Sequence, residues 1–306
     1  MEYVLQTFGL TKKYSKQLCV NQVNINIRKG DIYGFVGENG SGKTTIIRMV
    51  TGLIMPNEGT YRLFGVASTD PKIRQVRRKM GAVVESPAIY LNLTAKDNLL
   101  MQAKLLGVTD MEKVRKTLET VGLGDLYDSK KKAENFSLGM RQRLGIAMAL
   151  VGDPEFLILD EPMNGLDPAG IVEIRELILH LNQKGITFMI SSHILTELSL
   201  VATKYGIISK GTLLEEITAK QLRDNTGKHL LLRVQNPAAL IALSKTLFPD
   251  LPVTLAGDAV KIGGHIDLNA FLKAVIDSGN AIASVNSVET GFEEYYLSVI
   301  GGGKHA

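Results

Sequence analysis

The chain has 306 residues, a length that suggests about two domains of ordinary size. Hydrophobic residues make up 45% and charged residues 22%, the balance of a soluble globular protein. The formal charge is only +4, too weak an excess to argue for nucleic-acid binding by itself. The single cysteine, Cys19, excludes an intrachain disulfide.

The sequence predicts no membrane-spanning segment. Residues 1–10 mix polar and apolar side chains, unlike a signal peptide, which has a basic start followed by an apolar run. No stretch of roughly 18 apolar residues occurs anywhere in the chain. A role at a membrane would therefore require a partner protein.

The most specific motif is the glycine-rich segment 37–44, which matches the pattern G-x-x-x-x-G-K-T. A short apolar strand is expected at 32–36 directly before it, and a helix at 43–52 directly after it. Glycines let the backbone fold around phosphates, and the helix adds its positive N-terminal dipole. Lys43 can reach the β- and γ-phosphates of ATP, and the Thr44 hydroxyl can ligate Mg²⁺. The expected nucleotide-binding residues of this loop are Gly37, Asn39, Gly40, Ser41, Gly42, Lys43, Thr44 and Thr45.

The segment 95–151 changes to a helical pattern. Apolar residues recur at three- and four-residue spacing, which predicts helices at 95–106, 110–121 and 138–151. Asp110 is a candidate helix cap. We interpret residues 86–150, approximately, as a helical subdomain inserted in an α/β core that also has strands at 4–8 and 23–27.

A second chemical motif follows the apolar run 156–159, which is typical of a strand buried on both faces of a parallel sheet. Another such strand is expected at 186–190, after a crossover helix at 168–183. Asp160 and Glu161 stand at the carboxyl end of the first strand, where ligands bind in open α/β sheets. Asp160 can hold Mg²⁺ through water, and Glu161 can polarise the attacking water as a general base.

After about residue 215 the pattern starts again. Strands and helices are expected in the order β-α-β-β-α-β, which suggests a small ferredoxin-like domain at 216–306. The expected elements are strands at 229–234, 253–255, 260–262 and 281–288, helices at 237–247 and 268–278, and a last helix at 292–300.

Together these motifs resemble the ATP-binding subunit of an ABC transporter, over roughly residues 1–215. The string at 136–143, Phe-Ser-Leu-Gly-Met-Arg-Gln-Arg, is similar to the family's signature motif, with Leu138 and Met140 in place of the usual Gly and Gln. In that family the motif caps the γ-phosphate held by a second subunit. The resemblance implies that Ser137, Gly139 and Met140 contact nucleotide.

Three further positions match the family in the expected order. Tyr14 matches the aromatic residue that stacks on adenine, and Asp167 lies in the loop that contacts the opposite subunit. His193 matches the switch histidine that touches the γ-phosphate. Taken alone, Tyr14 and His193 would each be read as packing residues.

Glu85 is the most informative departure, because the family usually has a magnesium-ligating glutamine there. Glutamate followed by Ser86-Pro87 resembles the branch that handles bacitracin and lantibiotic peptides, in export or producer self-protection. Both side chains offer an oxygen to a hard cation, so the exchange could also be neutral. We expect Glu85 to tune magnesium binding and coupling rather than to serve as the base. The expected metal ligands are Thr44, Glu85 and Asp160, and the expected catalytic residues are Glu161, His193 and Glu85.

The resemblance implies an ABC-type P-loop ATPase core at 1–215 with an inserted helical subdomain, followed by an accessory domain. It implies an ATPase that uses ATP and Mg²⁺ and works as a homodimer. It also implies a separate transmembrane permease that holds the protein on the inner, cytoplasmic face of the cell membrane. The alternative is a soluble ABC-type ATPase acting on nucleic acid or ribosomes. Such proteins commonly carry two ATPase units or a long coiled coil, and neither is expected here.

Two other classes fit less well. A nucleotide-dependent kinase or switch GTPase would lack the string at 136–143 and the later histidine in this order. A catalytically silent regulator is disfavoured because Lys43, Asp160, Glu161 and His193 are all present.

Overall fold

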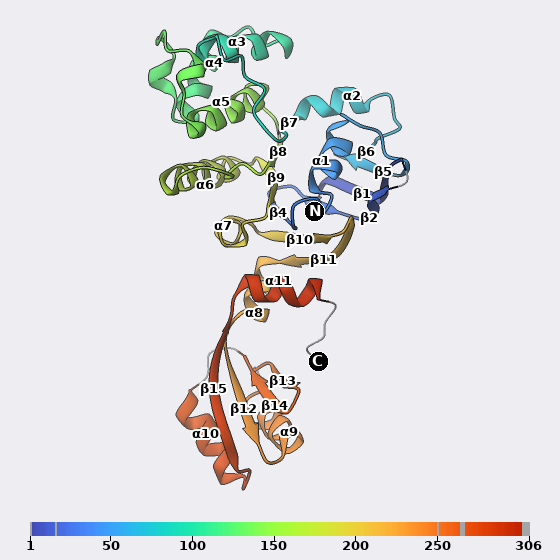
Figure 1. The fold of residues 1–306 in the computed structure, drawn as a ribbon, viewed down its shortest axis with the longest axis vertical. Coiled ribbons are helices and arrows are strands. Elements are labelled where there is room, and N and C mark those ends of the chain that lie inside the picture. Colours follow the sequence, from blue (N-terminus) through green and yellow to red (C-terminus); the bar gives the residue numbers. More distant parts are fainter. Residues whose placement is uncertain (1, 16, 250, 264–266, 302–306) are drawn as a thin grey trace. The chain divides into compact units, whose positions relative to one another are not determined.

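The chain folds into two compact units, residues 1–216 and 217–306, and each has its own sheet and core (Figure 1). The computed structural model describes residues 2–15, 17–249, 251–263 and 267–301. In this part of the chain, no helix combines the length and the apolar character needed to cross a bilayer.

A largely parallel sheet forms the centre of unit 1, in the order β11-β10-β4-β9-β8-β7. Every residue of β4, β8 and β9 is buried, and Figure 1 shows α1 on one side of these strands and α6 on the other. The parallel pairing of β8 with β9 confirms the predicted strand–helix–strand unit. The strands are β4 (Ile32–Val36), β7 (Met80–Val83), β8 (Phe156–Asp160), β9 (Thr187–Ser192), β10 (Lys204–Ser209) and β11 (Thr212–Thr218).

An antiparallel sheet lies beside it, in the order β2-β1-β5-β6 with β3 paired to β1. The single strand predicted at 23–27 is wrong, because the chain leaves the ladder between β2 and β3. The buried Thr7 hydroxyl donates to the Val23 carbonyl at 2.9 Å and accepts from the Ile25 N–H at 2.7 Å, which replaces backbone pairing there. The strands are β1 (Tyr3–Tyr14), β2 (Gln17–Val23), β3 (Asn26–Arg28), β5 (Glu58–Leu63) and β6 (Val66–Ala67).

Helices complete unit 1, and those between residues 95 and 150 form the separate helical segment seen in Figure 1. Asp110 caps α4 as predicted, since its side chain accepts from the Glu112 N–H. The helices are α1 (Lys43–Thr51), α2 (Ile73–Val76), η1 (Arg77–Lys79), α3 (Ala95–Leu105), α4 (Met111–Thr120), η2 (Gly124–Leu126), η3 (Ala133–Asn135), α5 (Leu138–Leu150), α6 (Pro168–Gln183) and α7 (Leu195–Ser199).

Unit 2 contains an antiparallel sheet in the order β13-β14-β12-β15. Phe271 and Val275 of α10 and Leu240 of α9 belong to its core, together with Leu232 and Val260 from the sheet. Its elements are α8 (Ala219–Asn225), β12 (Gly227–Val234), α9 (Pro237–Leu247), β13 (Val253–Ala256), β14 (Ala259–Ile262), α10 (Leu268–Asp277), β15 (Ile282–Thr290) and α11 (Phe292–Ile300).

Candidate functional site

The glycine-rich loop joins the carboxyl end of β4 to the first turn of α1. Gly40 and Gly42 have φ values of 79° and 107°, in the left-handed region that glycine adopts without strain. Within the described chain, no side chain caps the N-terminus of α1. Its first N–H groups and its dipole therefore favour an anion such as a phosphate.

Lys43 lies in this loop with its ammonium group turned inward and 5% of its surface exposed. Its Nζ donates to the carbonyl oxygens of Gly37 at 2.5 Å and Glu38 at 3.2 Å, and lies 3.3 Å from Glu161 Oε1. The buried Ser41 hydroxyl has no hydrogen-bond partner among the described residues. A buried cation and an unpaired hydroxyl beside uncapped amides are donors that fit a polyphosphate.

Asp160 is the last residue of β8 and 1% exposed. Thr44 donates its hydroxyl to Asp160 Oδ2 at 2.9 Å, and Ser191 donates to Asp160 Oδ1 at 2.5 Å. These groups meet because β4, β9 and β8 are parallel neighbours whose carboxyl ends reach the same edge of the sheet. A hydroxyl and a carboxylate side by side are the hard oxygen ligands that Mg²⁺ prefers.

Glu161 follows directly, with a φ of 51°, a backbone conformation that non-glycine residues rarely adopt. Its Oε2 lies 2.8 Å from His193 Nδ1 and also accepts from the His193 N–H at 3.3 Å. The carboxylate therefore stands between Lys43 and His193, two residues placed independently on α1 and after β9. A carboxylate in this position can accept a proton from a water held next to the phosphates.

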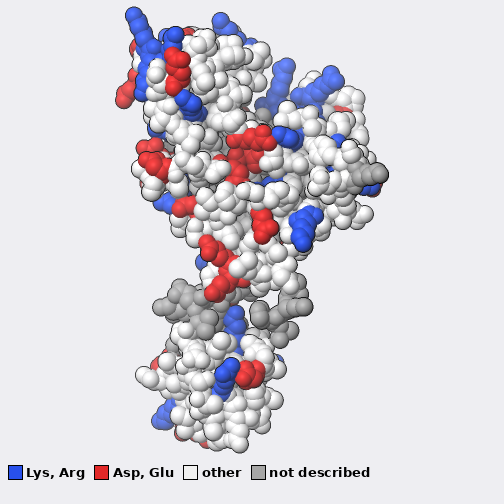
Figure 2. Space-filling model, viewed as in Figure 1, with Lys and Arg blue, Asp and Glu red and all other residues white. Residues whose placement is uncertain are grey.

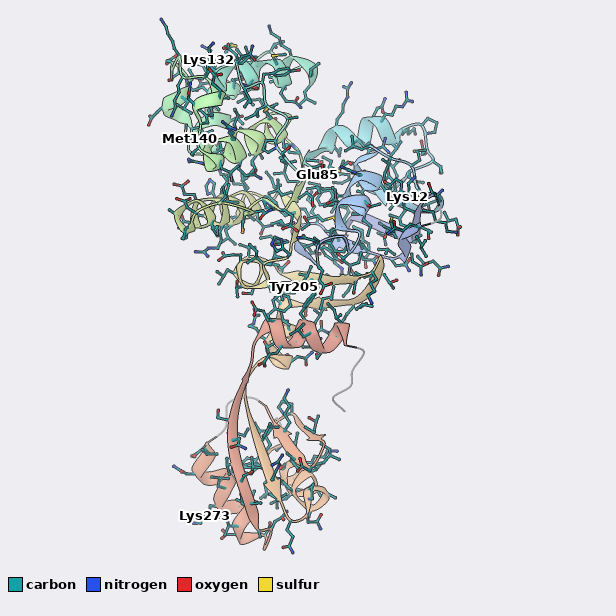
Figure 3. The ribbon with its side chains drawn as sticks, in the orientation of Figure 1. Lys12, Glu85, Lys132, Met140, Tyr205 and Lys273 are labelled. Carbon is teal, nitrogen blue, oxygen red and sulfur yellow. The ribbon has the colours of Figure 1, made fainter. Side chains whose placement is uncertain are left out.

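Glu85 follows β7 and is held differently. Its φ is 62°, and its Oε1 pairs with Arg48 Nη2 of α1 at 2.6 Å. Figure 2 shows acidic side chains gathered between the helical segment and α1, the region in which Figure 3 labels Glu85. Arg48 lies one helical turn after Thr44. Because the ion pair is largely exposed, the Glu85 carboxylate stays open to solvent even while it is paired with Arg48.

The string at 137–140 does not join this group. Its helix, α5, has 13 residues, so its ends are separated by about 20 Å. The Ala149 end packs on Gly81 of β7, which leaves Ser137 and Met140 at the opposite end (Figure 3). There Ser137 caps the helix, accepting from the Met140 N–H at 3.2 Å.

The remaining predicted residues also lie outside the contacts around Lys43. Asp167 caps α6, accepting from the Gly170 N–H at 3.1 Å. Leu166, which directly precedes Asp167, is the residue nearest to the open side of Gly139: a Cβ added to Gly139 would lie 3.9 Å from the Leu166 side chain. Tyr14 ends β1 and is 43% exposed, with Lys12 Nζ 5.4 Å from its ring centroid.

Two residues that the sequence analysis did not single out belong to the site, Arg48 and Ser191. Arg48 lies one helical turn after Thr44, a spacing that places both on one face of α1. Ser191 directly precedes the Ser192-His193 pair on a strand whose other residues are mostly apolar. A hydroxyl at a fully buried strand position is the signal that marks it, since buried polar groups need a partner.

A cleft of about 400 Å³ lies between the core and the helical segment. It is lined from the core by Leu53 and Val84, from the helical segment by Leu106 and Met148, and by Pro87 just beyond Glu85. Leu53 of this lining is also exposed to solvent, as are Met55 and Leu105, which are near Leu53 and Leu106 in the sequence. The exposed fractions are 65% for Leu53, 73% for Met55 and 82% for Leu105.

Comparison with known proteins gives consistent matches. The model of the ABC transporter family matches residues 20–164. The chain is 41% identical to the bacitracin transport ATP-binding protein BcrA of Bacillus licheniformis, over 99% of each chain. It is 43% identical to the lantibiotic transport ATP-binding protein SrtF of Streptococcus pyogenes, over 70% of this chain and 90% of the relative. A solved ATP-binding cassette of an ABC transporter in its ADP conformation superposes with a TM-score of 0.65. It is 26% identical and covers 73% of this chain and 94% of its own.

Proposed function

Because the chain belongs to the family of ATP-binding subunits of ABC transporters, we propose that it powers the export or clearance of antimicrobial peptides such as bacitracin or lantibiotics. The chain is an ATPase that uses ATP with Mg²⁺. The observation that supports the cargo is the 41% identity to a bacitracin transport protein, which spans both units of this chain rather than the ATPase unit alone.

Within the ATP site, we assign roles from the contacts. Lys43 and the amides at the start of α1 bind the phosphates, and Thr44 and Asp160 hold Mg²⁺, which neutralises phosphate charge when bound. Glu161 is the general base, and His193 orients it through the 2.8 Å contact and reaches toward the γ-phosphate. Glu85 tunes magnesium binding, and Tyr14 stacks on adenine.

We propose that a second copy of this chain completes the site. Subunits of this family work with a membrane permease, typically as dimers. Ser137, Gly139 and Met140 lie at the end of α5 remote from β7 and outside the contacts around Lys43, which supports contact with nucleotide held by another subunit. One chain carries both halves, which favours a homodimer with Asp167 at the contact between subunits.

The permease is proposed to dock in the cleft beside Glu85. The cleft has an apolar lining that includes the exposed Leu53, and Met55 and Leu105, which are near lining residues in the sequence, are exposed as well; exposed apolar surface of this kind is what a helix of a membrane protein would cover. Docking there touches both the core and the helical segment, so closure of the dimer can be passed to the permease. Under this proposal the protein lies on the cytoplasmic face of the membrane, held there by the permease.

Unit 2 is proposed to be a ferredoxin-like accessory domain that begins at about residue 216, after an ATPase domain with an inserted helical subdomain. Its strand order, β13-β14-β12-β15, and its β-α-β-β-α-β connectivity support that assignment. Removing residues 220–306 tests its role. We expect lower permease association or lower ATPase activity, whereas unchanged values in both would leave it a stabilising appendage.

The cargo is tested in the cell that encodes the chain. Replacing the gene with one that encodes the Glu161→Gln variant should make the strain several-fold more sensitive to bacitracin or to a lantibiotic. Glu119→Gln, an exposed substitution on α4, is the matched control and should leave sensitivity unchanged. Unchanged sensitivity to both peptides in the Glu161→Gln strain would contradict the proposed cargo while leaving the ATPase assignment intact.

A further inference from the structure

We propose that Ser191 is a positioning residue for ATP hydrolysis, fixing the magnesium-binding carboxylate and the general base at the same time. The proposal rests on the roles of Asp160 and Glu161 given above. Ser191 lies on β9 directly opposite Asp160 of β8 in the parallel register, and its surface is completely buried.

The hydrogen bonds of Ser191 define the direction of its proton. Its Oγ accepts from the Glu161 N–H at 2.9 Å, so the hydroxyl proton is directed to Asp160 Oδ1, 2.5 Å away. Thr44 donates to the other oxygen, Oδ2, at 2.9 Å. Both oxygens of Asp160 thus accept hydrogen bonds, which prevents rotation of its carboxylate. Thr44 keeps its lone pairs for a cation, since its own proton is directed to Asp160.

The same hydroxyl supports the backbone of Glu161. The left-handed φ of 51° at Glu161 is a conformation that persists only where neighbouring groups hold it. The Glu161 N–H is shared between the Ser191 carbonyl at 3.2 Å and the Ser191 Oγ at 2.9 Å. Losing the hydroxyl would leave one bond to the strand and free the peptide to relax. The Glu161 carboxylate would then leave its place between Lys43 and His193.

The alternative is that Ser191 only fills a buried polar position in β9. Its neighbour Ser192 provides the contrast, because it is 4% exposed and on the same strand, but its Oγ accepts from the Ile194 N–H at 2.9 Å. A structural role predicts that both serines behave alike when truncated. A positioning role predicts that only Ser191 affects the cation and turnover.

The test compares Ser191→Ala, Ser191→Thr and Ser192→Ala in the full chain. We expect Ser191→Ala to lower kcat roughly tenfold or more, as expected for loss of a charge-assisted hydrogen bond. KM for ATP should change little, because the phosphate loop is untouched, and the half-saturating Mg²⁺ concentration should rise several-fold. Ser191→Thr keeps the hydroxyl and should restore most of the activity, and Ser192→Ala should resemble the wild type.

A readout independent of turnover is the affinity for Mn²⁺, measured by electron paramagnetic resonance on the ATP-bound protein in the Glu161→Gln background. Adding Ser191→Ala should weaken Mn²⁺ binding several-fold. Wild-type Mn²⁺ affinity in that variant, or an equal loss for Ser192→Ala, would overturn the proposal. Turnover of Glu161→Gln reports on the general base and Mn²⁺ affinity on Ser191, so the two assignments can fail separately.

Discussion

The residues around Lys43 and those around Ser137, which we propose to be the two halves of one composite site, are organised in opposite ways. Around Lys43, side chains from α1, β8 and the end of β9 already contact one another within one chain. Around Ser137, the side chain is used to cap its own helix, and a Cβ on Gly139 would be close to Leu166 alone among described residues. The first half is preorganised, and the second has an open backbone that, under the proposed dimer, a second chain would contact.

The largest expected effect comes from the preorganised half. Glu161→Gln should lower kcat by about 100-fold or more, because a general base contributes that much to proton transfer. ATP binding should persist, since Lys43 and the amides of α1 remain, and is measured by equilibrium titration. Glu85→Gln is the matched variant at the other acidic position and should retain most turnover. If Glu85→Gln abolished turnover and Glu161→Gln did not, the assignment of the base would be wrong.

The contacts of the preorganised half are also the ones that follow most directly from sequence patterns. A P-loop between a strand and a helix, and a carboxylate pair after a buried strand, are local patterns whose geometry follows from parallel pairing. Ser191 and Arg48 were missed because their importance depends on register and on helix-to-strand packing, which one sequence does not reveal. The split of 23–27 into two strands was missed for a similar reason: it depends on the hydroxyl of Thr7, which is 16 and 18 residues before its two partners in the chain.

The open half gives the next largest effect, and mixing variants tests it. Ser137→Arg and Lys43→Ala should each reduce turnover of the pure protein at least about tenfold, the first by blocking the facing site and the second by losing a phosphate contact. In a mixture of the two, some dimers pair an intact loop with an intact signature string. Those dimers should recover part of the wild-type activity, measured as phosphate release against the mixing ratio.

Recovery on mixing requires that Lys43 and Ser137 act in different chains. A mixture whose activity equals the average of the two pure variants would mean that each chain works alone. The control mixture combines Ser137→Arg with Gly139→Arg. Both variants damage the signature string, so no dimer in this mixture has an intact site and no activity should be recovered.

A smaller effect is expected at Glu85, which links the two halves because it lies between α1 and the helical segment. Arg48 pairs with the carboxylate at 2.6 Å and competes with a cation for it. Arg48→Met should lower the half-saturating Mg²⁺ concentration by about two- to fivefold, the scale of a largely exposed ion pair. In the Glu85→Gln background, Arg48→Met should have little effect. Equal effects in both backgrounds would mean that Arg48 acts without Glu85.

The smallest effect is expected at Glu155, which directly precedes β8 and so lies at the opposite end of that strand from Asp160. Hydrogen bonds from Lys79 and then Lys29, against the cost of burial, lower the pKa of Glu155 below its ordinary 4.5. A lowered pKa means that the charged form stabilises the fold above pH 4.5 and that this contribution is lost as the pH falls through the folded-state pKa. Glu155→Gln should therefore lower the free energy of unfolding at pH 7, by less than about 1 kcal/mol because solvent screens the pair. The difference from wild type, measured by urea unfolding, should shrink below pH 4.5, while turnover at pH 7 stays unchanged.

That result would divide the ion pairs of the parallel sheet by position. Those at the carboxyl ends of the strands would serve hydrolysis, and those at the amino ends would serve stability. A loss of turnover in Glu155→Gln would contradict that division.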